Sequence, residues 1–140
     1  MASDLFTTAP IESVVGDFCR RSAMKFATIS GLMSFLELQE GWQAIEKWQE
    51  LSDSEIFRIC TAADIPNGPV SVISEASYRE GLGAFQIQAE SLTQFVPMHR
   101  FIFSECMFDG DLLILDGNGR VAWAFHHEGM YLVFDSRHAI

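Results

Sequence analysis

Residues 100–136 read RFIFSECMFDGDLLILDGNGRVAWAFHHEGMYLVFDS, and this stretch predicts most of a β-sheet. It divides into four short apolar segments, RFIFSEC, LLILD, RVAWAFHHE and MYLVFDS, which short turns separate. Asp116-Gly117-Asn118-Gly119 is typical of a hairpin turn, because glycine and asparagine adopt the positive φ angles that tight turns need. His127-Glu128-Gly129 provides the next turn. We therefore predict four strands from Arg100 onward.

The middle of the chain contains two segments with a period of two residues, Val70-Ser71-Val72 and Phe85-Gln86-Ile87-Gln88. Such alternation of apolar and polar residues is typical of strands with one buried face. Residues 77–83 read as a loop or a short turn, and residues 91–98 as a short helical turn that Pro97 ends. Together with the C-terminal strands, these segments predict a sheet of about five to six strands.

Helical periodicity dominates the first half of the chain. Proline is favoured in the first turn of a helix, so we expect a helix to begin near Pro10. Its apolar residues repeat at the spacing of one helical face, as Ile11, Val14, Val15, Phe18 and Cys19. Ser52-Asp53-Ser54-Glu55 has the pattern of a capping box and begins a later helix. Pro66-Asn67-Gly68-Pro69 ends that helix.

The segment between these two helices is less regular. Residues 24–40 are compatible with a helix or with a strand, and we favour a helix over residues 29–38. Further along, the spacing of Trp42, Ile45 and Trp48 predicts a short helix with a wide aromatic face.

Helices thus come first and strands second, which predicts an α+β fold. We expect N-terminal helices packed on a C-terminal, mostly antiparallel sheet, all within a single domain over residues 1–140. Residues 1–9 read as a loose arm that precedes the first helix.

The composition argues against several classes of partner. The formal net charge is −10 at pH 7, which disfavours nucleic acid and anionic membrane surfaces. No stretch approaches the ~20 apolar residues of a membrane span, and the first ten residues, MASDLFTTAP, lack the pattern of a secretory signal. The three cysteines, Cys19, Cys60 and Cys106, predict buried free thiols in a reducing compartment. These features favour a cytoplasmic protein whose partner, if charged, is basic.

Several pairs of residues invite a metal or a catalytic interpretation. Neighbours on a strand point to opposite faces, so only one of His126 and His127 is expected to enter any single pocket. Asp109-Gly110-Asp111 begins like a calcium loop, but Arg120 stands where that loop needs a glutamate. Cys106 lies in an apolar context that favours a packed thiol over a nucleophile. We therefore predict no catalytic residue, no metal site and no cofactor.

Tryptophans and acids alternate between residues 42 and 55, where we expect a candidate protein-binding surface. One interpretation places the indoles in the core with the acids in solvent; the other makes them exposed anchors with an acidic rim. The candidate binding residues of this surface are Trp42, Trp48, Glu46, Glu50 and Glu55.

A second hypothesis is a small-molecule-binding protein or small enzyme with an apolar pocket between the helices and the sheet. The candidate lining residues are Trp123, Phe125, His127 and Tyr131. A third hypothesis, compatible with either of the others, is that the aromatic face of the sheet is the contact of a homo-oligomer.

The run FIFSECMFDGDLLILDGNGRVAWAFHHEG, residues 101–129, resembles the C-terminal core of the SUKH superfamily. The shared features are an apolar strand, a Gly-Asp step, an apolar strand ending in Asp, a glycine-rich turn and an aromatic strand ending in His-Glu. They fall at Phe101–Phe103, Gly110-Asp111, Leu112–Asp116, Gly117–Gly119 and Trp123–Glu128. The resemblance implies a non-enzymatic immunity-type protein that binds a bacterial toxin, and the acidity of the chain would complement a basic toxin.

Overall fold

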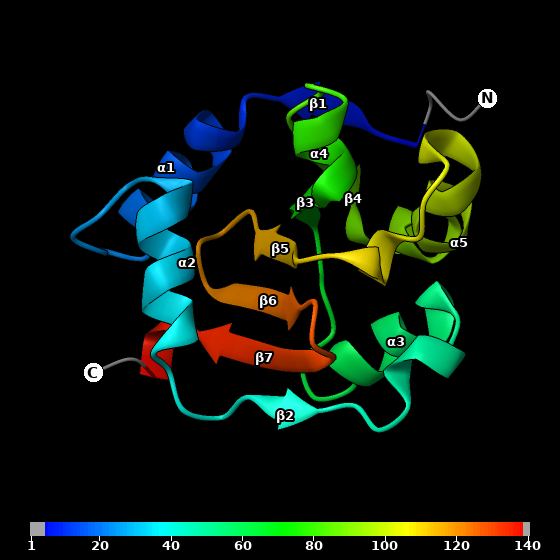
Figure 1. Cartoon of the computed structure of the whole chain (residues 1–140). Helices are drawn as coiled ribbons and strands as arrows, with labels where there is room; N and C mark the ends of the chain where they lie inside the picture. Colours follow the sequence, from blue (N-terminus) through cyan, green and yellow to red (C-terminus); the bar gives the residue numbers. More distant parts are fainter. Residues whose placement is uncertain (1–4, 139–140) are drawn as a thin grey trace.

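The computed structural model describes residues 5–138, and a seven-stranded antiparallel sheet runs through the middle of them (Figure 1). The strand order is β1-β4-β3-β5-β6-β7-β2. The strands are β1 (Thr7–Ala9), β2 (Gln43–Ala44), β3 (Pro69–Ile73), β4 (Ala84–Gln88), β5 (Leu112–Asp116), β6 (Val121–His126) and β7 (Met130–Asp135). The α+β prediction is confirmed, with more strands than expected.

The described part of the chain contains five α-helices beside the sheet: α1 (Ile11–Arg21), α2 (Ile29–Glu37), α3 (Asp53–Cys60), α4 (Glu75–Arg79) and α5 (Leu92–Phe103). Short 3-10 turns lie between these elements or after the last strand, at η2 (Trp48–Glu50), η3 (Ala89–Ser91), η4 (Met107–Asp109) and η5 (Ser136–His138). Within residues 5–138, no helix has the length and apolar character that a bilayer crossing requires.

Strand β5 shows why both faces of the sheet need cover. Its residues Leu112 to Leu115 are all buried, and they alternate between the two faces. Leu112 and Ile114 pack in the cluster that contains side chains of α3 and α5, and Leu113 and Leu115 pack in the cluster of α1 and α2. The sheet is therefore the middle layer between two groups of helices, as Figure 1 shows.

Two helices begin at capping residues, close to where the sequence predicted them. Ser52 accepts a hydrogen bond from the backbone of Glu55, and the Glu55 carboxylate accepts one in return from the Ser52 backbone, which completes the capping box of α3. Thr28 caps α2, so the helical alternative for residues 29–38 is confirmed. The hairpin at Asp116–Gly119 is also confirmed, with Gly119 at a φ of +72°.

The first predicted strand of the C-terminal stretch, RFIFSEC, is wrong, because residues 100–103 are the end of α5. This helix buries Phe95, Val96, His99 and Phe103, which recur at helical spacing on one face. Pro97 lies inside the helix on its exposed side instead of ending it.

The short helix predicted around Trp42, Ile45 and Trp48 is also wrong. Lys47, inside the predicted helix, has a φ angle of +55°, and Gly41, just before it, has one of +104°. Neither angle belongs to a right-handed helix, so the helix does not form. Residues 43–44 instead form edge strand β2, which pairs with β7, and a 3-10 turn follows at residues 48–50.

Two further expectations about loops need correction. Residues 1–9 were expected to be a loose arm, yet Thr7–Ala9 form β1 and pair with β4, while residues 1–4 lie outside the described part of the chain. The Phe6 ring packs edge-on against Phe85 with 5.2 Å between centroids, and this apolar contact holds the strand in place. Residues 75–79 form α4, so the loop expected over residues 77–83 begins later.

The cysteine prediction holds for two of the three thiols. Cys19 and Cys60 are buried, and burial raises the pKa of the Cys60 thiol to about 12. Cys106 is exposed, because it follows the end of α5 in a surface segment and not in the strand that was expected there.

Candidate functional site

The turn between β6 and β7 positions two histidines side by side. His126 pairs with Met130, so the loop between them has three residues, and the Gly129 N–H donates to the His126 carbonyl at 2.8 Å. Gly129 has a φ of +86°, the left-handed conformation that such three-residue hairpin loops place at their last position. A Cβ atom at this position would overlap the Trp48 indole, so the turn needs glycine here.

This turn overturns the expectation that His126 and His127 point apart. His126 is the last residue of β6, whereas His127 belongs to the turn, where strand alternation no longer applies. The two imidazole centroids lie 4.1 Å apart, with 30° between the ring planes. The neighbouring histidines therefore share one side of the turn.

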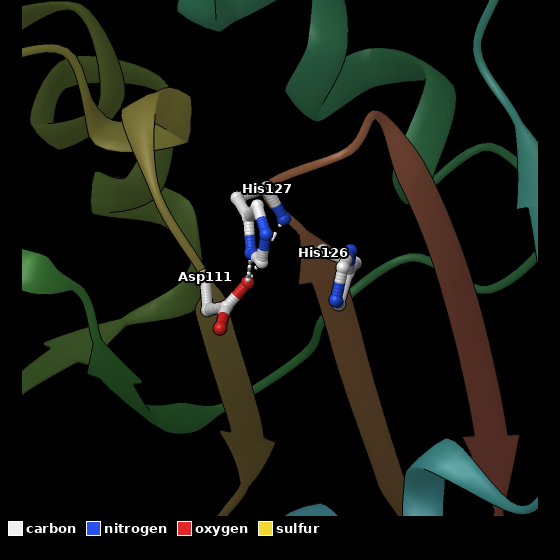
Figure 2. A group of neighbouring side chains, drawn as sticks. All are labelled: Asp111, His126 and His127. Carbon is white, nitrogen blue, oxygen red and sulfur yellow. Dashed lines mark hydrogen bonds and ion pairs between the residues drawn. The ribbon is translucent and has the colours of Figure 1, made fainter.

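Asp111 joins this pair from the adjacent strand. It directly precedes β5, whose Leu112 pairs with Phe125 of β6. Asp111 Oδ1 accepts hydrogen bonds from the backbone N–H of His127 and from its Nδ1, both at 2.9 Å. Figure 2 shows the three side chains gathered where β5 begins and β6 ends. One ligand atom from each of Asp111, His126 and His127 lies within 4.8 Å of the other two.

The charges in this cluster stabilise one another. The hydrogen bond to Asp111 raises the pKa of the exposed His127 imidazole, and the charges of Glu128 and Glu75 act in the same direction. Burial by itself would raise the pKa of Asp111, but the hydrogen bonds from His127 outweigh it and hold that pKa below its usual value. The cluster is therefore an environment that favours positive charge.

A small cavity of about 210 Å³ adjoins the cluster, since Asp111 forms part of its wall. Glu75 and Tyr78 of α4 supply its other polar groups, and burial followed by nearby acidic charges raises the pKa of Tyr78. Apolar side chains of α2, β3 and β5 complete the lining, namely Ile29, Met33, Ile73, Leu112 and Leu113.

A larger groove of about 850 Å³ lies between α1 and the β1–β4–β3 end of the sheet. Here the sheet face that α1 and α2 cover elsewhere is more polar, because β3 contributes Ser71 and β4 contributes Gln86 and Gln88. Asp17 of α1 and Asp116 of β5 add carboxylates to the groove wall. Amides, a hydroxyl and carboxylates together can form hydrogen bonds to a polar ligand.

Ser74 and His99 form a buried pair that resembles part of a catalytic dyad. The Ser74 Oγ and His99 Nε2 are 2.9 Å apart, and His99 Nδ1 lies 2.8 Å from the Glu105 carbonyl oxygen. A carbonyl only accepts, so Nδ1 carries the proton and Nε2 accepts from the Ser74 hydroxyl. Both residues have no exposed surface, and the third partner is a carbonyl instead of a carboxylate. The pair therefore stabilises the core, and a substrate could not reach the hydroxyl.

The aromatic residues of the predicted acidic surface are half-buried. The Trp42 indole N–H donates to the Leu36 carbonyl at 3.0 Å, and the Trp48 ring packs edge-on against Phe125 at 5.4 Å. Both indoles therefore attach their segment to the body of the protein. Glu46, Glu50 and Glu55 are exposed, as both interpretations of this surface required.

Three residues of the second predicted set, Trp123, Phe125 and Tyr131, come together in the core and not around a pocket, since Phe125 pairs with Tyr131 and all three pack in one cluster. Trp123 and Phe125 are buried in the core on the α3–α5 side, where the Trp123 indole N–H donates to the Asp64 carbonyl. Tyr131 is half-buried beside Gln43, and His127 is exposed in the turn. Neither cavity described above within residues 5–138 is lined by any of these four residues. The aromatic sheet face fills the chain's own core, which also leaves it unavailable as the contact of a homo-oligomer.

The sequence contains a weak signal for the histidine cluster, because His126 and His127 are adjacent and precede Glu128-Gly129. The alternation of side chains along a strand nevertheless predicted that the two histidines point to opposite faces. Nothing in the sequence signals the buried Ser74–His99 pair, because the two residues are 25 positions apart and share no motif.

Comparisons of this chain with protein-family models, with curated proteins and with solved structures found no match. The resemblance of residues 101–129 to the SUKH superfamily stays a prediction. Its first segment, Phe101–Phe103, lies in α5 and not in a strand.

Proposed function

We propose that this chain is a non-enzymatic, cytoplasmic protein-binding module whose partner is basic. The observation that carries the proposal is a row of exposed carboxylates that follows α2, edge strand β2 and the start of α3. This acidic edge consists of Glu37, Glu40, Glu46, Glu50 and Glu55. Lys47 is the only lysine or arginine between Glu37 and Glu55, so the segment is strongly negative.

The acidic edge is part of the folded structure and not a loose tail. Trp42 and Trp48 attach the segment through the contacts described above, and the Ile45 side chain is buried. Carboxylates on an ordered backbone can match a fixed pattern of lysines and arginines, which increases the association rate and the specificity of a complex. Leu38, of which 84% is exposed, adds an apolar contact among these charges.

The resemblance to the SUKH superfamily supports the same proposal from the sequence. It implies an immunity-type protein, and a basic nuclease-like toxin is a partner that the acidic edge would complement. Such a partner also agrees with a net charge of −10, which disfavours direct binding of nucleic acid or of anionic membranes.

The test is a pull-down from the native host with two matched triple variants. Glu40→Gln, Glu46→Gln and Glu50→Gln together neutralise the acidic edge; Glu80→Gln, Glu90→Gln and Asp109→Asn remove the same number of exposed charges elsewhere. We expect a stoichiometric basic protein with the wild type and with the control variant, and its loss with the edge variant. We also expect it to elute as salt increases, because salt screens exposed charges. A partner that the edge variant retains undiminished would refute this surface.

A second candidate function is the binding of a small polar ligand in the 850 Å³ groove, which its amide and hydroxyl lining favours. A ligand in the groove would raise the melting temperature of the wild type but not of a Gln86→Leu variant. A metabolite library that leaves the melting temperature of the wild type unchanged would eliminate this candidate.

A further inference from the structure

We propose that Asp111, His126 and His127 form a binding site for a divalent transition-metal ion of the Zn²⁺ class, at the turn between β6 and β7 (Figure 2). We call these three residues the turn site. It is independent of the acidic edge, because none of its residues belongs to that surface.

The register of the backbone brings the three residues together. Leu112 pairs with Phe125, and one further step of the same register sets Asp111 opposite His126. Cross-strand neighbours of this kind have Cβ atoms roughly 4.5–5.5 Å apart. The three-residue loop then turns His127 toward the same side, and the hydrogen bond from its backbone N–H to Asp111 fixes that position.

The distances suit a site that closes around an ion. Bonds of about 2.0–2.2 Å in a tetrahedral zinc site place neighbouring ligand atoms roughly 3.4 Å apart. The ligand atoms of the turn site lie within 4.8 Å of one another, so each pair must approach by little more than an ångström. The side chains of His127 and Asp111 are 57% and 43% exposed, which leaves them room for that adjustment.

Two imidazoles and one carboxylate are ligands that borderline transition metals prefer, whereas Mg²⁺ and Ca²⁺ prefer oxygen alone. His127 Nδ1 and Asp111 Oδ1 already lie 2.9 Å apart, so an ion held by both would replace the Nδ1 proton, while the hydrogen bond from the His127 backbone N–H to Oδ1 remains.

His126 needs one tautomer change to become a ligand. Its Nδ1 accepts from the backbone N–H of Glu128 at 3.2 Å, which places the proton of the neutral ring on Nε2. Ligation through Nε2 moves that proton to Nδ1 and gives up the bond from the Glu128 N–H; the exposed Glu128 carboxylate, now 3.9 Å away, would move closer to accept a hydrogen bond from Nδ1. A histidine held between a carboxylate and a metal is the usual arrangement around protein-bound ions.

The surroundings of the turn site favour a cation. Glu128 Oε1 lies 3.9 Å from His126 Nδ1. Glu75 lines the same cavity as Asp111 and packs so closely on Gly110 that a Cβ atom there would overlap it. Three protein ligands leave at least one coordination position open. The 210 Å³ cavity that Asp111 borders lies next to the site, so a water or a small ligand there could complete the coordination shell.

The test uses the full chain after dialysis against a chelator, with Co²⁺ as a spectroscopic probe that Zn²⁺ then displaces. We expect one Co²⁺ per chain and its release by one equivalent of Zn²⁺. His126→Gln and His127→Gln should each weaken binding by at least about a hundredfold, and Asp111→Asn by at least about tenfold. His138→Gln removes a histidine elsewhere in the sequence and should bind as the wild type does.

Folding of each variant is checked by its melting temperature without metal. With Zn²⁺ in excess, the melting temperature should rise for the wild type and for His138→Gln only. An independent readout on the wild type is the imidazole NMR signals, of which those of His126 and His127 should broaden with Co²⁺ while that of His99 does not. A wild type that binds neither Co²⁺ nor Zn²⁺ at one per chain would overturn the proposal. So would turn-site variants that bind as tightly as the wild type.

Discussion

Gly129 shows how a single residue can set the geometry of the turn site. Its left-handed φ and the Trp48 ring beside it both exclude a side chain, for two separate physical reasons. Gly68 has a similar φ of +73° but open space around it, so it separates the two effects within the same chain.

We therefore expect Gly129→Ala to destabilise the protein more than Gly68→Ala does. The left-handed conformation alone costs about 1–2 kcal/mol for a residue with a Cβ atom. Overlap with the Trp48 indole should add roughly 1–3 kcal/mol, as overpacking does in other cores. Urea unfolding of both variants measures the difference, and the fluorescence of Trp48 should change for Gly129→Ala alone. Equal losses of stability in the two variants would show that the indole moves aside at no cost.

The sequence predicted the glycine-containing turn itself, because Gly129 follows His127-Glu128 at the end of an alternating strand. It could not predict which way His127 points, since that depends on where the strand stops and the turn begins. A shift of one residue in that boundary decides whether the two histidines lie on opposite faces or on the same side.

At the scale of elements, β1 is where a short polar segment becomes part of the sheet. Thr7 and Thr8 are exposed, so burial of their side chains does not explain the strand. Phe6, just before it, packs against Phe85 of β4 and Phe95 of α5 at centroid distances of 5.2 and 5.6 Å. The aromatic contact therefore anchors the strand, and the backbone pairing with β4 follows from it.

Phe6→Ala should accordingly cost about 2–3 kcal/mol in the free energy of unfolding, somewhat less than a fully buried phenylalanine, because the ring is only half-buried. Thr8→Ala, two residues further on at an exposed position, should change it by less than about 0.5 kcal/mol. Chemical denaturation gives both values. Amide hydrogen exchange should in addition show faster exchange across β1 in Phe6→Ala only. If the two substitutions have the same small effect, residues 5–9 are a loose arm after all.

Elements whose signals are local were predictable, and elements that depend on distant packing were not. The capping box of α3 lies within four consecutive residues, and it forms as expected. The end of α5 has the apolar run Phe101-Ile102-Phe103, which equally suits a strand. The helix is favoured by Phe103, whose ring stacks on that of Phe85 with 4.9 Å between the centroids. That contact joins residues 18 positions apart, so no short window of sequence contains it.

At the scale of the whole molecule, stability depends on a buried histidine that links three parts of the chain. His99 of α5 contacts Ser74, which caps α4, and the carbonyl of Glu105, which lies beyond the end of α5. Burial lowers the pKa of His99, and this effect exceeds the opposing influence of the Glu105 carbonyl and of the Asp53 and Glu105 charges. The folded protein therefore keeps the ring neutral where the unfolded chain, with a pKa of about 6.5, takes up a proton.

The sign of the pH dependence follows from proton binding. Because the unfolded state binds the extra proton, His99 contributes no pH dependence well above pH 7, and stability falls as the pH drops below about 6.5 toward the folded pKa. The exposed His127, whose pKa is raised, acts in the opposite direction, but about 0.5 M salt screens its attraction to Asp111. In that salt, with chelator present, we expect the free energy of unfolding measured with urea to decrease from pH 7.5 to 5.5. His99→Gln, whose amide can donate to Glu105 and accept from Ser74, should remove most of that decrease. His138→Gln should keep it, and a His99→Gln variant with the same pH dependence as the wild type would show that other groups are responsible.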